Sequence, residues 1–206
     1  MKGLLLKDWY VMKKTCRAYL LLVVVFLAIS AFGGENVFMI FYPAMLVGMI
    51  PVTLLGYDER CKWQITCAAM PCTRAQFVSA KYLVGLLAQL ATLALTALAQ
   101  ALRMTLNGGF HWLTWGTLLA VLLAMSLLTA AITPPFMFRF GVEKGRILYC
   151  VTIGLMCGGS TVVGLSGALD AAPFTVTALV GMVAAAAAVY ALSWRLSIAL
   201  YQKREL

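Results

Sequence analysis

The sequence is poor in charged residues, and acidic residues are the scarcest. Only 11% of its 206 residues are charged, with seven Asp and Glu against 16 Lys and Arg, whereas about 25% of a soluble domain is charged. Hydrophobic residues make up 63% of the chain, compared with about 45–50% in soluble domains. This composition excludes a water-soluble globule and predicts an integral membrane protein.

The sequence also lacks the motifs of common enzymes. It has no phosphate-binding loop, no H-E-x-x-H zinc motif and no G-x-S-x-G nucleophile turn. His111 is the only histidine, and the six cysteines show no paired C-x-x-C spacing. The sequence therefore shows no evident set of residues for acid–base catalysis or for metal binding. We therefore expect a non-catalytic chain with no metal site and no cofactor of its own.

Uncharged apolar runs dominate the chain, and each is close to the roughly 20 residues that cross a membrane. They predict an all-α, polytopic membrane protein of one transmembrane domain, residues 1–206. None of the runs contains Asp, Glu or His, so the membrane interior lacks a group that could relay an ion, and a separate ATPase is the expected energy source. The six predicted spans are 18–33, 37–56, 82–102, 113–138, 147–169 and 174–194.

Lys and Arg lie almost entirely in alternate connections between these runs. Fifteen of the 16 fall on the side of the N-terminus, and Arg103 alone falls on the other side. The positive-inside rule then places both termini, including the tail 195–206, in the cytoplasm. Because the cations are divided among four short segments, no nucleic-acid surface is expected.

The first 17 residues have the pattern of an amphipathic helix. Its apolar stripe contains Leu5, Trp9, Met12 and Cys16, and its lysines, Lys7 among them, share a separate arc. We expect this helix to lie in the plane of the inner lipid headgroups.

The longest hydrophilic stretch is residues 57–81. It predicts a short helix that ends near Pro71, in which Asp58 can pair with Lys62. Thr73 and Gln76 then form a capping box that begins the next helix.

An apolar stripe interrupts this hydrophilic stretch. Trp63, Cys67 and Met70 fall on one face of its short helix. Such a stripe needs cover, either from the lipid surface, with Trp63 as an interfacial anchor, or from a groove of a partner protein.

Two patterns within the runs indicate helix contacts or a transport path. Gln89, Thr92, Thr96 and Gln100 share one arc of the third run and either line a translocation path or form hydrogen bonds between helices. Gly154 and Gly158 fit the G-x-x-x-G form of tight helix packing, which could be a dimer seam.

Several segments together resemble the ABC-2 family of transporter permeases, and in particular its short bacterial six-span members that work with a separate ATPase. They are the opening residues 1–8, the stretches 58–63, 70–74 and 79–82, and the loop 140–146. The resemblance covers the whole chain in order and spacing.

The resemblance implies that residues 1–17 form the family's elbow helix. Residues 59–71 would be a coupling helix seated in a cleft of the ATPase, and loop 139–146 would make a second contact. Two permease chains, identical or diverged, and two ATPase chains that bind ATP and Mg would form an exporter in the bacterial inner membrane. The expected coupling residues are Trp63, Met70, Pro71, Arg74, Glu143 and Arg146.

Two other functions are compatible with a small six-span protein. One is the membrane-embedded substrate-binding component of a vitamin importer, and the other is an immunity or stress protein that transports nothing. The importer component is less favoured because the outer loops 34–36, 103–112 and 170–173 are too short to form a lid. The substrate is not encoded in any motif of the sequence.

Overall fold

The computed structural model of the chain describes residues 2–32, 37–63, 66–67, 73–106, 112–165 and 176–202. Nearly all of these residues are helical, and no strand occurs among them, which confirms the predicted all-α class. Seven helices are described: α1 (Lys2–Thr15), α2 (Arg17–Phe32), α3 (Val37–Arg60), α5 (Arg74–Leu106), α6 (Trp112–Phe140), α7 (Val142–Leu165) and α9 (Val176–Gln202).

Four helices are long and apolar enough to cross a membrane. They are Ile40–Arg60 within α3, Arg74–Leu106, Trp112–Phe140 and Thr177–Gln202. Arg17–Ser30 is a shorter apolar helix, and the total of six spans stays a prediction.

Several helices extend beyond their predicted apolar runs. α3 continues past residue 56, the end of its apolar run, to Arg60, and α5 begins at Arg74, directly after the predicted capping residue Thr73 and before the apolar run that starts at residue 82. α9 likewise continues through most of the predicted tail to Gln202. Charged residues at the two ends of the hydrophilic stretch 57–81, such as Asp58 and Lys81, therefore lie on helices.

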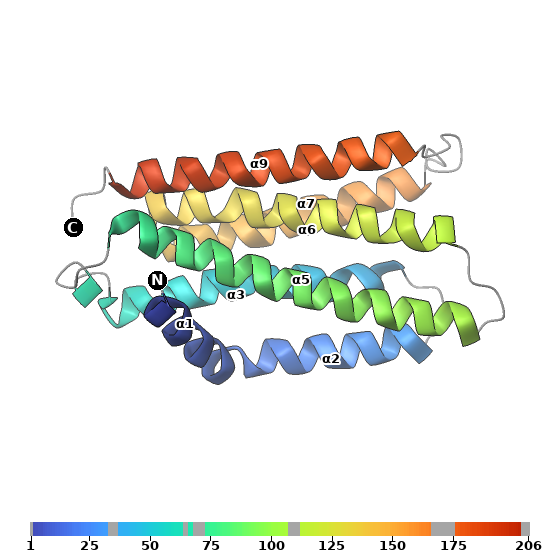
Figure 1. The fold of residues 1–206 in the computed structure, drawn as a ribbon, viewed down its shortest axis with the longest axis horizontal. Coiled ribbons are helices and arrows are strands. Elements are labelled where there is room, and N and C mark those ends of the chain that lie inside the picture. The colour runs from blue at the N-terminus through green and yellow to red at the C-terminus, as the bar shows by residue number, and fades with distance from the viewer. Residues whose placement is uncertain are drawn as a thin grey trace.

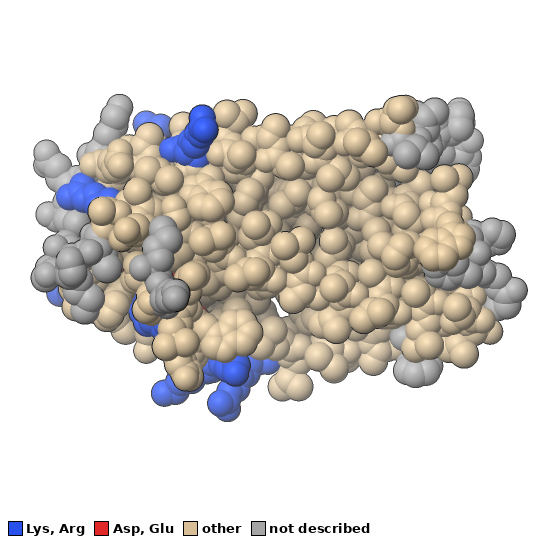
Figure 2. Space-filling model, viewed as in Figure 1, with Lys and Arg blue, Asp and Glu red and all other residues tan. Residues whose placement is uncertain are grey.

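The helices run side by side along the long axis of the molecule, and the short α1 crosses at an angle to α2 (Figure 1). α6 packs along α9, and α3 packs against both α2 and α5. The start of α1 and the end of α9 lie toward one end of the bundle (Figure 1). Lys and Arg side chains gather toward the same end (Figure 2), which we call the basic end.

An aromatic core joins α5, α6 and α9 at the basic end. Phe77 and Phe138 each pack on the ring of Tyr201, with centroids 5.5 and 5.4 Å apart. The Tyr82 hydroxyl lies 2.6 Å from the Ser197 hydroxyl, and the Tyr190 hydroxyl donates to the Tyr82 carbonyl at 3.0 Å. These contacts hold α5 and α9 together where the charged residues begin.

Candidate functional site

Three buried charged side chains and the partly exposed Lys7 form a cluster at the basic end, which no local pattern of the sequence predicts. Lys7 and Asp8 come from α1, Asp58 from α3 and Lys81 from α5. Asp8 and Asp58 are each 1% exposed, and Lys81 is 3% exposed. We call these four residues the charge cluster.

Each charge in the cluster has an opposite charge beside it. Lys81 Nζ lies 2.5 Å from Asp58 Oδ2 and 2.7 Å from Asp8 Oδ1. Lys7 Nζ lies 2.5 Å from Asp58 Oδ1. Two cations and two anions balance, and this balance is what makes buried charges tolerable. The cluster thereby ties α1 to the end of α3 and the start of α5.

The predicted pair between Asp58 and Lys62 is wrong. α3 ends at Arg60, and Lys62 has a φ of 51° in the turn that follows, so the four-residue helical spacing is broken between them. Asp58 instead turns inward to Lys7 and Lys81. Lys7 was predicted to share one arc of α1 with the other lysines, but its side chain is directed toward Asp58.

Trp63 lies directly beside the cluster. Lys7 Nζ stands 4.5 Å from the centre of the Trp63 ring, over its face. The ring packs against the apolar core to which the buried Cys67 also belongs. Met70 and Pro71 lie outside the described residues, as do residues 64–65 and 68–69 of the predicted coupling helix 59–71, whose first two residues belong to α3.

The start of α5 has the predicted capping box. The Thr73 N–H donates to Gln76 Oε1, and the Gln76 N–H donates to Thr73 Oγ1, each at 3.3 Å. Arg74, the next residue, donates from Nη1 to the Gln202 carbonyl at 3.0 Å. Arg74 therefore links α5 to the end of α9.

A polar recess of about 410 Å³ opens beside the end of α3. Glu59 Oε2 accepts a hydrogen bond from the Val142 N–H at 3.2 Å, at the N-terminus of α7. Gly141, between α6 and α7, has a φ of 89°, which favours glycine. The charged residues that line the recess are Glu59, Arg60, Glu143, Lys144 and Arg146. The structure thus brings Glu143 and Arg146 next to the end of α3.

The polar residues predicted to share one arc of the third run are all buried. Gln89 Nε2 donates to the Ser126 carbonyl on α6 at 3.0 Å, and Gln100 Nε2 donates to Ser30 Oγ on α2 at 2.6 Å. The hydroxyls of Thr92 and Thr96 donate to carbonyls of α5 itself. The arc therefore faces neighbouring helices, and its role in a transport path stays a prediction.

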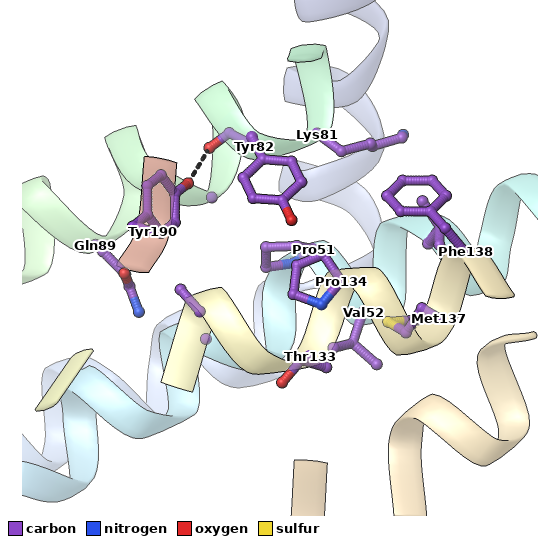
Figure 3. A pocket seen from close by; sticks show the side chains of 14 residues that line it. Pro51, Val52, Lys81, Tyr82, Gln89, Thr133, Pro134, Met137, Phe138 and Tyr190 are labelled. Atoms are coloured by element: carbon purple, nitrogen blue, oxygen red, sulfur yellow. Dashed lines mark hydrogen bonds between the residues drawn. The ribbon is translucent and has the colours of Figure 1, made fainter. Parts of the chain in front are cut away.

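A small cavity lies deeper in the bundle, between α3, α5, α6 and α9 (Figure 3). Pro51, Tyr82, Gln89 and Pro134 are among its lining residues, and Lys81 of the charge cluster reaches it (Figure 3). Its volume is about 20 Å³, which is enough for about one water molecule. Ligand pockets measure about 300–1,000 Å³, so this cavity is too small for a substrate in the present conformation.

Gly154 and Gly158 lie on an exposed side of α7. A Cβ atom added at either position would meet no atom within 4 Å outside its own helix backbone, and the neighbouring Leu155 is 72% exposed. Among the described residues, no second helix therefore makes the close approach at these positions that the G-x-x-x-G form predicts.

Comparisons with known proteins identify one family. A family model described as "ABC-2 family transporter protein" matches residues 3–202. No curated protein and no solved structure matches the chain.

Proposed function

Because this chain belongs to the ABC-2 family of transporter proteins, we propose that it is the permease subunit of an ATP-driven exporter. A separate ATPase subunit would bind ATP and Mg and dock on the basic end. The family match carries the proposal, since it covers nearly the whole chain. The helices long enough to span a membrane agree with it.

The proposed topology has six spans, α2, α3, α5, α6, α7 and α9, in the bacterial inner membrane. Both termini would be cytoplasmic, and α1 would be the elbow helix in the headgroup plane. Two observations support this orientation: the start of α1 and the end of α9 lie toward one end of the bundle (Figure 1), and the cations gather there (Figure 2). Positive residues are retained on the cytoplasmic side of membranes.

The proposed ATPase contact combines the loop around Trp63 with the polar recess. Trp63 lies against Lys7 of the charge cluster, while Glu143 and Arg146 line the recess with Glu59 and Arg60. Both features belong to the basic end, so one docked subunit could contact both. The helix predicted over residues 59–71 is interrupted at Lys62, whose φ is 51°, so the coupling segment would begin at Trp63 and end at Pro71. Trp63, Met70, Pro71 and the nearby Arg74 would be the force-transferring residues.

The charge cluster would transmit movement of this loop to the spans. Asp58 and Lys81 stand at the two ends of the loop and are joined directly, so a displacement of the loop moves the ends of α3 and α5 together. Packed helices switch between discrete arrangements. ATP-driven closure of the ATPase would thereby tilt the spans of two permease chains, whose seam would contain Gly154 and Gly158.

Co-purification tests the proposal. The tagged chain, extracted from its native membrane, should bring down a subunit with a Walker motif whose ATP hydrolysis it stimulates. Arg146→Glu should weaken this capture, because it inverts a charge of the recess on an exposed side chain. Arg195→Glu, an exposed cation on α9, is the matched control and should leave capture unchanged.

A second pair of variants tests the tryptophan. Trp63→Asp should abolish the stimulation of ATP hydrolysis by the permease while the chain still inserts into the membrane. Trp112→Asp, at an exposed residue of the opposite end, should leave this stimulation unchanged. Stimulated hydrolysis that is unchanged by both Arg146→Glu and Trp63→Asp would contradict the docking proposal. A retained small ligand with no ATPase would instead indicate a substrate-binding component, and the capture of neither would indicate a protein that transports nothing.

A further inference from the structure

An apolar groove of about 600 Å³ opens between α1, α2 and α5. It exists because the chain bends at Cys16, so that α1 leans onto α5 and α3 while α2 continues along the bundle. Figure 2 shows this part of the surface hollowed, with Lys and Arg side chains projecting beside it. The buried residues Val47, Ile50 and Val84 are at the floor of the groove.

The interior of the groove favours hydrocarbon over water. Its walls include Leu20 and Val24 of α2 and Leu87 and Leu95 of α5, all of which are exposed. Thr92 is the one uncharged polar side chain among the lining residues, and its hydroxyl already donates to the Ala88 carbonyl at 2.8 Å. The lining therefore offers water little hydrogen bonding, whereas an alkyl chain would bury apolar surface at each contact.

The length of the groove matches one leaflet of a bilayer. Along α5 the lining extends from Val84 to Leu95, which spans roughly 16 Å at 1.5 Å per residue. Half of a hydrocarbon core about 30 Å thick is about 15 Å. The groove can therefore hold the acyl chain of a lipid from one leaflet.

The mouth of the groove carries positive charge, and no carboxylate is among its described lining residues. Lys13 lines it, and Arg17 follows one helical turn later with an exposed side chain. Arg17 Nε donates to the Lys13 carbonyl at 3.0 Å, which holds these two residues together. Asp8 is the one acidic residue of α1 and α2, and it is turned into the charge cluster.

We propose that this groove binds one anionic phospholipid of the cytoplasmic leaflet. Its phosphate would contact Lys13 and Arg17, and one acyl chain would fill the space between α1, α2 and α5. The cytoplasmic leaflet holds anionic lipids that attract such basic residues. The bound lipid would act as a wedge that sets the angle of α1. The proposal rests on the cytoplasmic location of α1, and it requires no ATPase.

Native mass spectrometry of the delipidated full chain in detergent tests it. The probes are phosphatidylglycerol and phosphatidylcholine with identical acyl chains, so that only the headgroup differs. The wild type should retain one phosphatidylglycerol molecule in preference to phosphatidylcholine. Lys13→Gln with Arg17→Gln should lower phosphatidylglycerol affinity about 25-fold, at the usual attraction per cation, and leave phosphatidylcholine binding unchanged.

Two further variants separate the alternatives. Arg139→Gln with Arg195→Gln removes two exposed cations elsewhere at the basic end and should change affinity less than about twofold. Ala91→Phe fills the groove wall and should weaken binding of both lipids. The proposal would be overturned if phosphatidylglycerol bound equally well to the wild type, to the double variant Lys13→Gln with Arg17→Gln, and to Ala91→Phe. A change of oligomeric state in Ala91→Phe with unaltered lipid binding would also overturn it, because a second copy of the chain would then occupy the groove.

Discussion

Lys81 Nζ lies 2.5 Å from Asp58 Oδ2, although the polar loop separates the two residues along the chain. The pair joins the last turns of α3 to the first turns of α5, and Lys81 also reaches Asp8 of α1. A single ammonium group therefore determines how three helices meet at the basic end.

Removing this ammonium group should destabilise the protein strongly. Lys81→Met leaves the cluster with one uncompensated negative charge, and breaking a buried pair in this way costs about 3–5 kcal/mol. Lys81→Met with Asp58→Asn removes one charge of each sign and should recover most of this loss. Thermal unfolding in detergent measures both effects. Lys62→Met, at an exposed lysine, is the control, and a Lys81→Met variant as stable as this control would contradict the assigned role.

Close packing of α3 on α5 should depend on Gly85. A Cβ added at Gly85 would stand 2.7 Å from Pro51 Cγ, so Gly85→Ala forces the helices apart and should cost about 1–3 kcal/mol. Gly181→Ala on α9, where a Cβ meets nothing within 4 Å, should stabilise by up to about 1 kcal/mol through helix propensity. Thermal unfolding of the two variants should shift in opposite directions, and shifts of the same sign would refute this account.

The hydrogen bond between Gln100 and Ser30 should contribute measurably to stability. A double-mutant cycle of Gln100→Leu and Ser30→Ala should give a coupling of about 0.6 kcal/mol, and at most about 1.7 kcal/mol, as for other bonds within membranes. Zero coupling combined with lost transport would instead favour the path role of this residue.

Cysteine labelling should distinguish Cys16 from Cys61. Burial raises the pKa of the Cys16 thiol above its ordinary value, so less of it is the reactive thiolate at any given pH. Cys61 is exposed. In single-cysteine variants, a maleimide should label Cys61 readily from the cytoplasmic side, and Cys16 should stay protected as the pH rises from about 7 to about 9.

The same measurement bears on membrane orientation. Labelling of Cys61 from the periplasmic side would invert the proposed topology. Cys67 is a poorer reporter because it is buried. Rapid labelling of Cys16 at neutral pH would show that the bend between α1 and α2 is more open than the structure indicates.

Several local features were correctly predicted from the sequence. The capping box of Thr73 and Gln76 depends on residues three apart, and it forms as expected. The apolar runs correspond to helices because their length and hydrophobicity are local properties. The capping box also gave the start of α5 correctly, whereas α3 continues past its apolar run to Arg60, because charged residues can continue a helix once a tertiary partner neutralises them.

The charge cluster could not have been predicted in the same way. Asp58 has a cation four residues later, Lys62, and the local rule favours that pair. The choice of Lys7 and Lys81 depends on which helices lie beside the end of α3 and on where that helix ends. The recess that joins Glu143 and Arg146 to Glu59 has the same origin.

The sequence by itself determined that the chain forms apolar helices with cations concentrated in alternate connections, because helix formation and membrane preference depend on runs of neighbouring residues. Only the tertiary structure decided which charges are buried together, which helices the polar face of α5 meets and where a groove remains. Those outcomes depend on contacts between helices far apart in the chain, and the periodicity of a single helix carries no information about its neighbours.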